Sequence, residues 1–241
     1  MQKALLLDVK KKNNREVVKV KMERTFAHRR HEVVRDAPMV GDFMERWPAL
    51  FEVNEVNAEF RRITTVPLQS KFLSQLDMYS EKLMRLFQKR GGKLGVQLKT
   101  VVEQMAKCDD VDAGRECIIK GVCIYMGEDP ESLVREYVCM DGGAMDEAIE
   151  DTTIGIYVIK EHVSNEETDD IGIILEGIKV LKDLDNVALA VAMLFGLIYA
   201  LNLSYPAELR YTFEVIQNIF MELDGNTLSN KALALKNRLL E

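Results

Sequence analysis

Closely spaced cysteine pairs are missing from this chain of 241 residues. Its four cysteines are isolated, and none forms a C-x-x-C pair; they are Cys108, Cys117, Cys123 and Cys139. Paired spacings are typical of zinc and redox sites, whereas isolated cysteines in a chain of this length are typical of reduced, buried thiols. We therefore expect neither a disulfide framework nor a metal site, and a reducing compartment, the cytoplasm or the nucleus.

Targeting and membrane signals are also scarce. The first residues, MQKALLLDVKKK, have no apolar segment of signal-peptide length before the lysines. The only long apolar run, residues 187–203, contains one strongly polar residue, Asn202, and has no lysine or arginine cluster beside it. A run of that length is at the lower limit for a membrane span. We expect a buried central helix there, and no membrane association.

Catalytic motifs are missing as well. The stretch KRGGKLG at 89–95 lacks the spacing of a phosphate-binding loop, and its paired glycines are ordinary helix terminators. His28 and His31 are three residues apart, but they have no third ligand near in sequence and lie among arginines. No G-x-S-x-G or H-E-x-x-H motif is present. The sequence therefore predicts no catalytic residues, no cofactor and no metal.

Charge is distributed unevenly along the chain. Residues 1–35 contain 11 Lys and Arg against 4 Asp and Glu, whereas residues 36–241 contain 21 against 35. A basic arm can bind phosphates, so nucleic acid is a possible partner. The candidate contacts are Lys10, Lys11, Lys12, Arg15, Lys19, Arg29 and Arg30. The alternative is an amphipathic helix that packs on the acidic body through the apolar stripe Val17, Val18, Met22 and Phe26.

Helix signals dominate residues 36–140. A short helix capped by Asp36 should end near Trp47, because the next residue is proline. Further helices are expected from Pro67, from a cap at Ser80, over 94–107, over 113–126, and from Pro130 onward. Trp47, the only tryptophan, is expected to be buried.

Strand signals begin after residue 150. IGIYVIK (154–160), IGIIL (171–175) and IKVL (178–181) predict three antiparallel strands, the last two joined by a tight turn at Glu176 and Gly177. The acidic connection between the first two strands should be a surface loop. Helices are expected over 187–203, over 207–223 and after a cap at Ser229.

Together these patterns predict an α+β fold that is mostly helical. Its three parts are a basic helical arm (1–35), an all-helical domain (36–140) and an α+β domain (150–241) in which a three-stranded antiparallel sheet packs on helices.

Several segments resemble those of one protein family. They are RWPALF (46–51), EFRRITT (59–65), MGEDPESLVREYV (126–138), LSYPAELRYTFEVIQ (203–217) and ALKNRLL (234–240). They are similar to segments of uncharacterised vertebrate proteins, mainly from fish, that are labelled similar to sterile alpha motif domain-containing protein three. The resemblance runs from about Lys10 to Glu241, and it carries over no catalytic or ligand residues. The sterile alpha motif itself is not recognisable in this chain.

Three hypotheses for the function remain. The first is an intracellular protein-interaction or scaffold protein without catalytic activity, which binds a protein partner or itself. The second is a nucleic-acid-associated protein that uses the basic arm; the arm offers only Phe26 for stacking on bases, which favours the first hypothesis. The third is an enzyme of unknown reaction, which would need a pocket with convergent polar groups.

Overall fold

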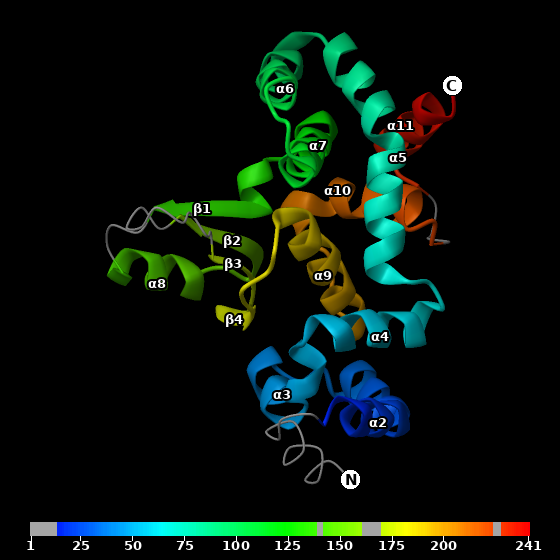
Figure 1. Cartoon of the computed structure of the whole chain (residues 1–241), viewed down its shortest axis with the longest axis vertical. Helices are drawn as coiled ribbons and strands as arrows, with labels where there is room; N and C mark the ends of the chain where they lie inside the picture. The colour runs from blue at the N-terminus through cyan, green and yellow to red at the C-terminus, as the bar shows by residue number, and fades with distance from the viewer. Residues whose placement is uncertain (1–13, 139–141, 161–169, 224–227) are drawn as a thin grey trace.

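The computed structural model describes residues 14–138, 142–160, 170–223 and 228–241, and the chain is mostly helical with one sheet (Figure 1). The elements before the sheet are α2 (Arg15–Asp36), α3 (Val40–Arg46), η1 (Pro48–Phe51), α4 (Val53–Thr64), α5 (Leu68–Lys89), α6 (Gly92–Met105) and α7 (Val111–Met126). The remaining elements are η2 (Pro130–Ser132), β1 (Val134–Val138), α8 (Gly142–Glu150), β2 (Ile154–Lys160), β3 (Asp170–Leu175), β4 (Ile178–Leu181), α9 (Val187–Ala200), η3 (Ala207–Leu209), α10 (Arg210–Val215), η4 (Ile216–Phe220) and α11 (Asn230–Leu240).

The sheet has four strands in the order β1-β2-β3-β4, and it is mixed. β2, β3 and β4 pair antiparallel where the sequence predicts three antiparallel strands, but β1 adds a parallel strand beside β2. The predicted helix from Pro130 is wrong: only one 3-10 turn forms there, and the chain then enters β1. The prediction that residues 36–140 are all helical is wrong for the same reason.

Both faces of the sheet are covered. Ile156 of β2 and Ile173 of β3 belong to the main core beneath α9, whereas Tyr157 and Ile174 belong to a smaller cluster that includes Ile149 of α8. Because successive strand residues point to opposite faces, β2 and β3 need apolar residues at nearly every position. The continuous apolar runs in the sequence follow from this double coverage.

The turn between β3 and β4 has the predicted length. Glu176 and Gly177 both have positive φ angles, 51° and 75°, which suits a two-residue hairpin turn. The predicted acidic loop between β2 and β3 lies mostly outside the described residues.

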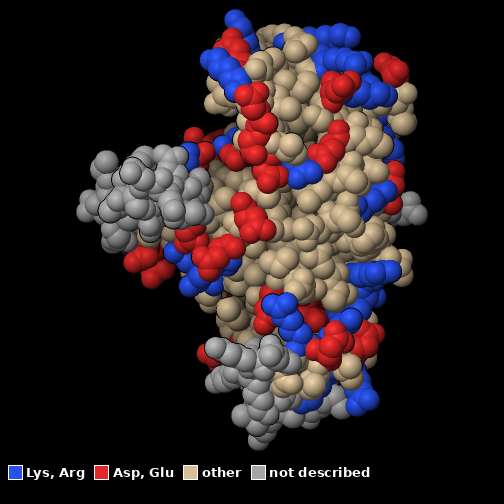
Figure 2. All heavy atoms as spheres, viewed as in Figure 1, with Lys and Arg blue, Asp and Glu red and all other residues tan. Residues whose placement is uncertain are grey.

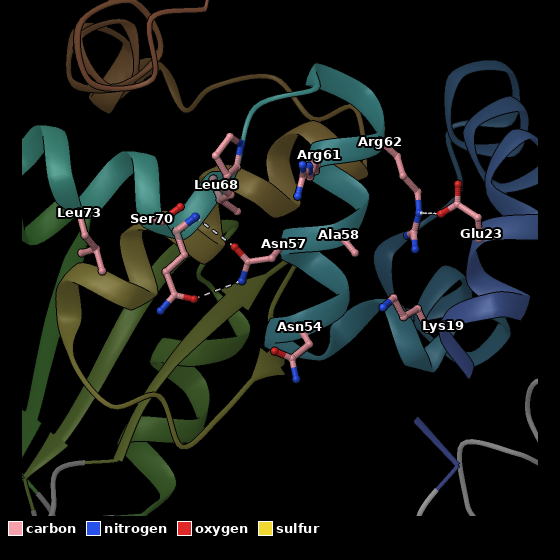
Figure 3. A pocket seen from close by; sticks show the side chains of 12 residues that line it. Lys19, Glu23, Asn54, Asn57, Ala58, Arg61, Arg62, Leu68, Ser70 and Leu73 are labelled. Carbon is pink, nitrogen blue, oxygen red and sulfur yellow. Dashed lines mark hydrogen bonds and ion pairs between the residues drawn. The ribbon is translucent and has the colours of Figure 1, made fainter. Parts of the chain in front are cut away.

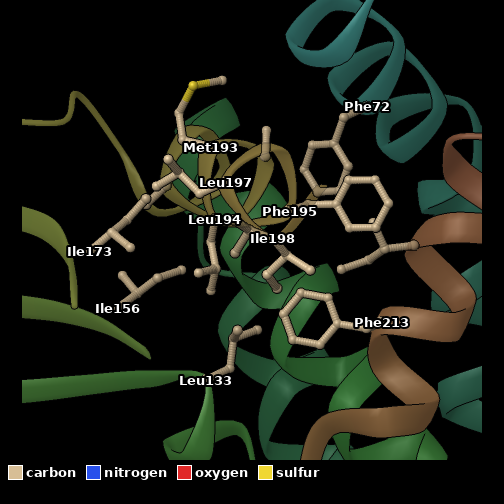
Figure 4. Packing of buried hydrophobic residues seen from close by; sticks show 14 of the residues in the cluster. Phe72, Leu133, Ile156, Ile173, Met193, Leu194, Phe195, Leu197, Ile198 and Phe213 are labelled. Carbon is tan, nitrogen blue, oxygen red and sulfur yellow. The ribbon is translucent and has the colours of Figure 1, made fainter. Parts of the chain in front are cut away.

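Helix α9 occupies the centre of the molecule and packs against β2 and β3 on one side and against α4, α5 and α7 elsewhere (Figures 1 and 4). Every residue from Val187 to Ile198 is buried, so the prediction of a buried central helix is confirmed. Asn186 caps it, since its side chain accepts a hydrogen bond from the Leu189 N–H at 2.8 Å. None of the helices in the described part of the chain has the length and apolarity needed to cross a membrane.

Two helix predictions are wrong in detail. Ser80 does not cap a new helix, because α5 runs unbroken through it and buries Leu76 and Leu83 on the same face. The single helix expected over 207–223 is divided into a 3-10 turn, a short α-helix and a π-helical segment.

Of two further predicted helix caps, Asp36 and Ser229, only the second is confirmed. Asp36 closes α2 instead of capping α3, whose N-cap is Met39. The cap at Ser229 is confirmed, since its hydroxyl oxygen accepts from the Ala232 N–H at 3.2 Å.

One continuous core joins the three parts of the chain that the sequence distinguishes. It contains Met22 of α2, Phe60 of α4, Phe72 of α5, Ile173 of β3 and Phe213 of α10.

Candidate functional site

An open groove of about 900 Å³ lies along α4, between α2 and α5 (Figure 3). We call it the α4 groove. Its lining residues are Lys19 and Glu23 of α2, Asn54, Asn57, Ala58, Arg61 and Arg62 of α4, Pro67, and Leu68, Gln69, Ser70 and Leu73 of α5. Apolar side chains and aliphatic stems alternate there with amides and cations, which is a chemistry suited to binding rather than to proton transfer.

A sharp turn sets α5 against α4. Thr65 ends α4 with a positive φ of 66°, and Pro67 precedes the first residue of α5. Asn57 then joins the two helices: its Oδ1 accepts from the Gln69 N–H at 3.1 Å, and its Nδ2 donates to Gln69 Oε1 at 3.3 Å. These bonds fix the first turn of α5 at the edge of the groove, because an N–H that the helix itself cannot satisfy is satisfied by α4.

The groove rests on the central helix. A Cβ atom added at Gly196 of α9 would lie 2.4 Å from Leu68 Cδ2 and 2.8 Å from Val56 Cγ1. The glycine therefore allows α4 and α5 to approach α9 more closely than a side chain would permit.

A buried ion network holds α2 against α4. Arg29 Nε and Nη2 donate to the two carboxylate oxygens of Glu59 at 3.0 and 2.6 Å. Arg62 donates to Glu59 at 2.7 Å and to Glu23 at 2.6 Å, and it also contacts Glu55 at 3.4 Å. The Arg29 and Glu59 side chains are only 1% and 4% exposed, so each charge is stabilised by its ion-pair partner in place of water.

Burial also affects the pKa of Glu55, another carboxylate of this network. Desolvation raises the pKa of Glu55 above its ordinary value, although the nearby Arg62 guanidinium opposes the shift. The network thus contains a carboxyl group that the folded state protonates more easily than the unfolded state does.

Two cations of the groove are free. Lys19 and Arg61 are exposed, and within the described part of the chain neither side chain has an ion-pair or hydrogen-bond partner. Arg62, by contrast, is committed to three carboxylates. The accessible charge of the groove is therefore positive.

The structure separates the residues that the sequence grouped as possible nucleic-acid contacts. Arg15 and Lys19 are exposed on α2. Arg29 is buried against Glu59, and Arg30 donates to the Tyr199 carbonyl oxygen at 3.0 Å. The other three residues, Lys10, Lys11 and Lys12, lie outside the described residues.

Helix α2 packs on the body, as the alternative interpretation of the arm expects. Val18 and Met22 are buried and Phe26 is half-buried, but Val17 is 43% exposed and does not belong to the inward stripe. The reason is that the buried face of α2 runs through Met22, Thr25 and Arg29, and Val17 lies outside this face.

Other candidate groups have structural partners. The His28 ring lies edge-on to Trp47 with 5.9 Å between ring centroids. Among the described residues, no cluster of three or more His, Cys, Asp or Glu side chains is arranged to hold a metal ion. In KRGGKLG, Arg90 and Gly91 lie between α5 and α6; Gly91 is the N-cap of α6, and Gly92 and Gly95 belong to that helix.

Sequence reasoning missed the α4 groove. Arg61 and Ala58 carry no motif, and only the packing of α2 and α5 on either side of α4 brings their side chains together with Lys19 and Leu73 (Figure 3). Of these four residues the sequence singles out only Lys19, as a possible nucleic-acid contact, and it gives no sign that Lys19 lies beside Arg61.

Comparison with known proteins gives one match. Residues 1–52 match the family described as "Sterile alpha motif domain-containing protein 3, helical domain". Neither the curated proteins nor the solved structures give a match. The matched segment ends at Glu52, the N-cap of α4, so it contributes Lys19 and Glu23 to the α4 groove. The chain is thus similar over residues 1–52 to the helical domain of sterile alpha motif domain-containing protein 3, which confirms for this segment the resemblance seen in the sequence.

Proposed function

We propose that this chain is an intracellular protein-interaction or scaffold protein without catalytic activity, located in the cytoplasm or nucleus, and that it binds a protein partner in the α4 groove. The observation that carries the proposal is the groove itself: an open surface between three helices, with Pro67, Leu73 and Ala58 accessible beside amide and cationic side chains. A segment of a partner protein can lay its apolar side chains there and satisfy its polar groups at the rim.

The shape favours a protein segment over a small molecule. Small-molecule sites enclose most of the surface of their ligand, whereas the α4 groove is open along its length. Its walls are also fixed before binding, by the Asn57–Gln69 bonds on one side and by the buried Arg29–Glu59 pair on the other. A fixed surface reduces the ordering cost of association.

A site-specific photo-crosslinker tests the proposal. Benzoylphenylalanine at Ser70, exposed on the α5 side of the groove, should form protein adducts in living cells, whereas the same group at Val96, exposed on α6 at the other end of the molecule, should not. The partner identified from the adduct, once purified, should bind the chain at least about tenfold more weakly after Ala58→Trp. Equal adducts at both positions, or a partner indifferent to Ala58→Trp, would refute groove binding.

The second candidate function, nucleic-acid binding, has one observation in its favour. Arg15, Lys19 and Arg24 are exposed on α2, and within the described residues none of their side chains has a partner. If they bind duplex DNA, the logarithm of affinity should fall with the logarithm of salt by about 0.9 per contact, so about −2.7 for these three. A Lys19→Gln variant should then reduce the slope by about 1.

A further inference from the structure

We propose that the segment bound in the α4 groove is an acidic amphipathic helix of a partner protein, whose carboxylates meet Lys19 and Arg61 while its apolar side chains cover Pro67 and Leu73. This inference rests on the proposed function and specifies the chemistry of the partner. It follows from three properties of the groove: the sign of its free charges, the positions of its cations and its accessible leucine, and the small residue between them.

The free charge of the groove opposes the charge of the molecule. The whole chain has a formal net charge of −7, yet the groove is lined by three cations and a single carboxylate, Glu23. Glu23 is already paired with Arg62 at 2.6 Å, and Arg62 is held by two further carboxylates behind it. Glu23 remains 67% exposed and offsets one charge, but Lys19 and Arg61 together keep the accessible charge of the groove positive. The groove therefore attracts carboxylates locally, whereas acidic and basic side chains are both spread over the face of the molecule shown in Figure 2.

The cation of α2 and the accessible leucine of α5 lie on opposite sides of the groove, and a second cation lies on α4 between them. Figure 3 shows Lys19 on the α2 side and Leu73 on the α5 side, with Asn54, Ala58 and Arg61 on α4 between them. A segment that satisfies both sides must itself be acidic along one edge and apolar along the other. An amphipathic helix provides this separation through residues spaced three and four apart.

Small and amide side chains occupy the middle of the groove. Ala58 is half-buried, and its short methyl side chain projects little from α4. Asn54, one turn earlier, is exposed and lacks a side-chain partner among the described residues, so its amide can bond a polar group of the segment. A helix can therefore lie close to α4 without burying an unsatisfied polar group at the centre of the contact.

The experiment uses the full chain and a fluorescein-labelled helical peptide of about 18 residues, with leucine in an i, i+3, i+4, i+7 pattern and glutamate at the remaining positions. Fluorescence anisotropy should show saturable binding that weakens as salt increases. The double variant Lys19→Glu and Arg61→Glu should weaken binding by about tenfold, as expected for two partly exposed ion pairs. Arg24→Glu, a single charge reversal on the exposed surface of α2 outside the groove, should leave affinity unchanged.

The controls separate the inference from the function on which it rests. A peptide with glutamine in place of every glutamate should bind about tenfold more weakly than the acidic peptide. If the two peptides bind equally, or if Arg24→Glu reduces affinity as much as the double variant does, the partner is not an acidic helix. Neither result contradicts binding of a protein partner in the groove. If Ala58→Trp affects neither the acidic nor the neutral peptide nor the cross-linked partner, the proposed function itself fails. Melting temperatures of all variants should match that of the unmodified chain, because Lys19, Arg24 and Arg61 are exposed and Ala58 lines the open groove.

Discussion

Replacement of Arg29 by methionine should destabilise the protein more than any other single charge removal in α2. The Arg29 side chain is 1% exposed and makes four hydrogen bonds: two to Glu59, one to the Met22 carbonyl oxygen at 2.9 Å and one to Thr25 Oγ1 at 2.6 Å. Methionine fills much of the same volume but donates no hydrogen bond. The perturbation therefore removes charge and donors while it preserves most of the packing.

The magnitude follows from what Glu59 loses. After the substitution, Glu59 Oε1 has no partner, and Oε2 keeps only Arg62 at 2.7 Å. Removal of one member of a buried ion pair costs about 3–5 kcal/mol, mainly because the other charge stays buried. Arg62 remains in place and offsets part of the loss, so we expect about 3 kcal/mol less free energy of unfolding.

Urea unfolding followed by far-ultraviolet circular dichroism measures this change. Backbone dichroism is preferable to tryptophan fluorescence, because the Arg29 guanidinium lies 5.5 Å from the Trp47 ring and its removal alters the probe directly. The matched control is Arg30→Met, the same change one residue later. It removes a bond to the Tyr199 carbonyl oxygen and a long, exposed bond to Asn202 Oδ1 at 3.4 Å, and it should cost about 1 kcal/mol.

A double variant tests the cause. Arg29→Met combined with Glu59→Leu leaves no uncompensated carboxylate, so it should be more stable than Arg29→Met alone by about 1 kcal/mol or more. The reasoning is refuted if Arg29→Met unfolds within about 1 kcal/mol of the unmodified chain, or if the double variant is the least stable of the three.

Three further perturbations follow from the structure. Trp47→Ala should cost about 3–5 kcal/mol, because the indole is fully buried; in the unmodified chain its fluorescence should resist acrylamide, and ready quenching would contradict this. Burial raises the pKa of the Cys123 thiol to about 12, so in a variant with the other cysteines replaced by serine, Ellman's reagent should react only after denaturant is added. The ammonium groups of Lys160 and Lys120 lower the pKa of Glu136 below its ordinary value, so the carboxylate stabilises the fold above that ordinary value. Glu136→Gln should therefore reduce the melting temperature at neutral pH, and the difference should vanish as the pH falls through the lowered pKa; a constant difference from pH 7 to pH 2 would contradict the assignment.

The parts of the fold that the sequence predicts are those with a local cause. An apolar run flanked by polar residues predicts α9, two residues between apolar strands predict the Glu176–Gly177 turn, and a serine before an amphipathic stretch predicts the start of α11. In each case the pattern and its explanation lie within about 20 neighbouring residues, where periodicity and capping act.

The parts that the sequence does not predict depend on distant partners. Residues Val134–Val138 become a strand because β2, more than 15 residues later, offers a parallel edge: Val134 pairs with Ile156 and Val138 with Lys160. The local signal, Pro130 after Asp129, indicates a helix start, and tertiary pairing overrides it after one turn. The α4 groove has the same origin, because Lys19, Arg61 and Leu73 belong to three helices and share no pattern.

The packing of α4 and α5 against α9 has a consequence for how the chain folds during synthesis. Leu68 contacts the surface beside Gly196, and Phe60 and Phe195 are 5.7 Å apart between ring centroids, so the floor of the groove is completed by residues that leave the ribosome more than 100 residues later. At typical translation rates this delay is on the order of ten seconds. During that interval the faces of α4 and α5 that pack on α9 have no native cover, although α2, α6 and α7 can already cover their other faces. The floor of the α4 groove is therefore completed only after α9 has been synthesised, so the proposed partner would find no finished groove on a nascent chain that lacks α9.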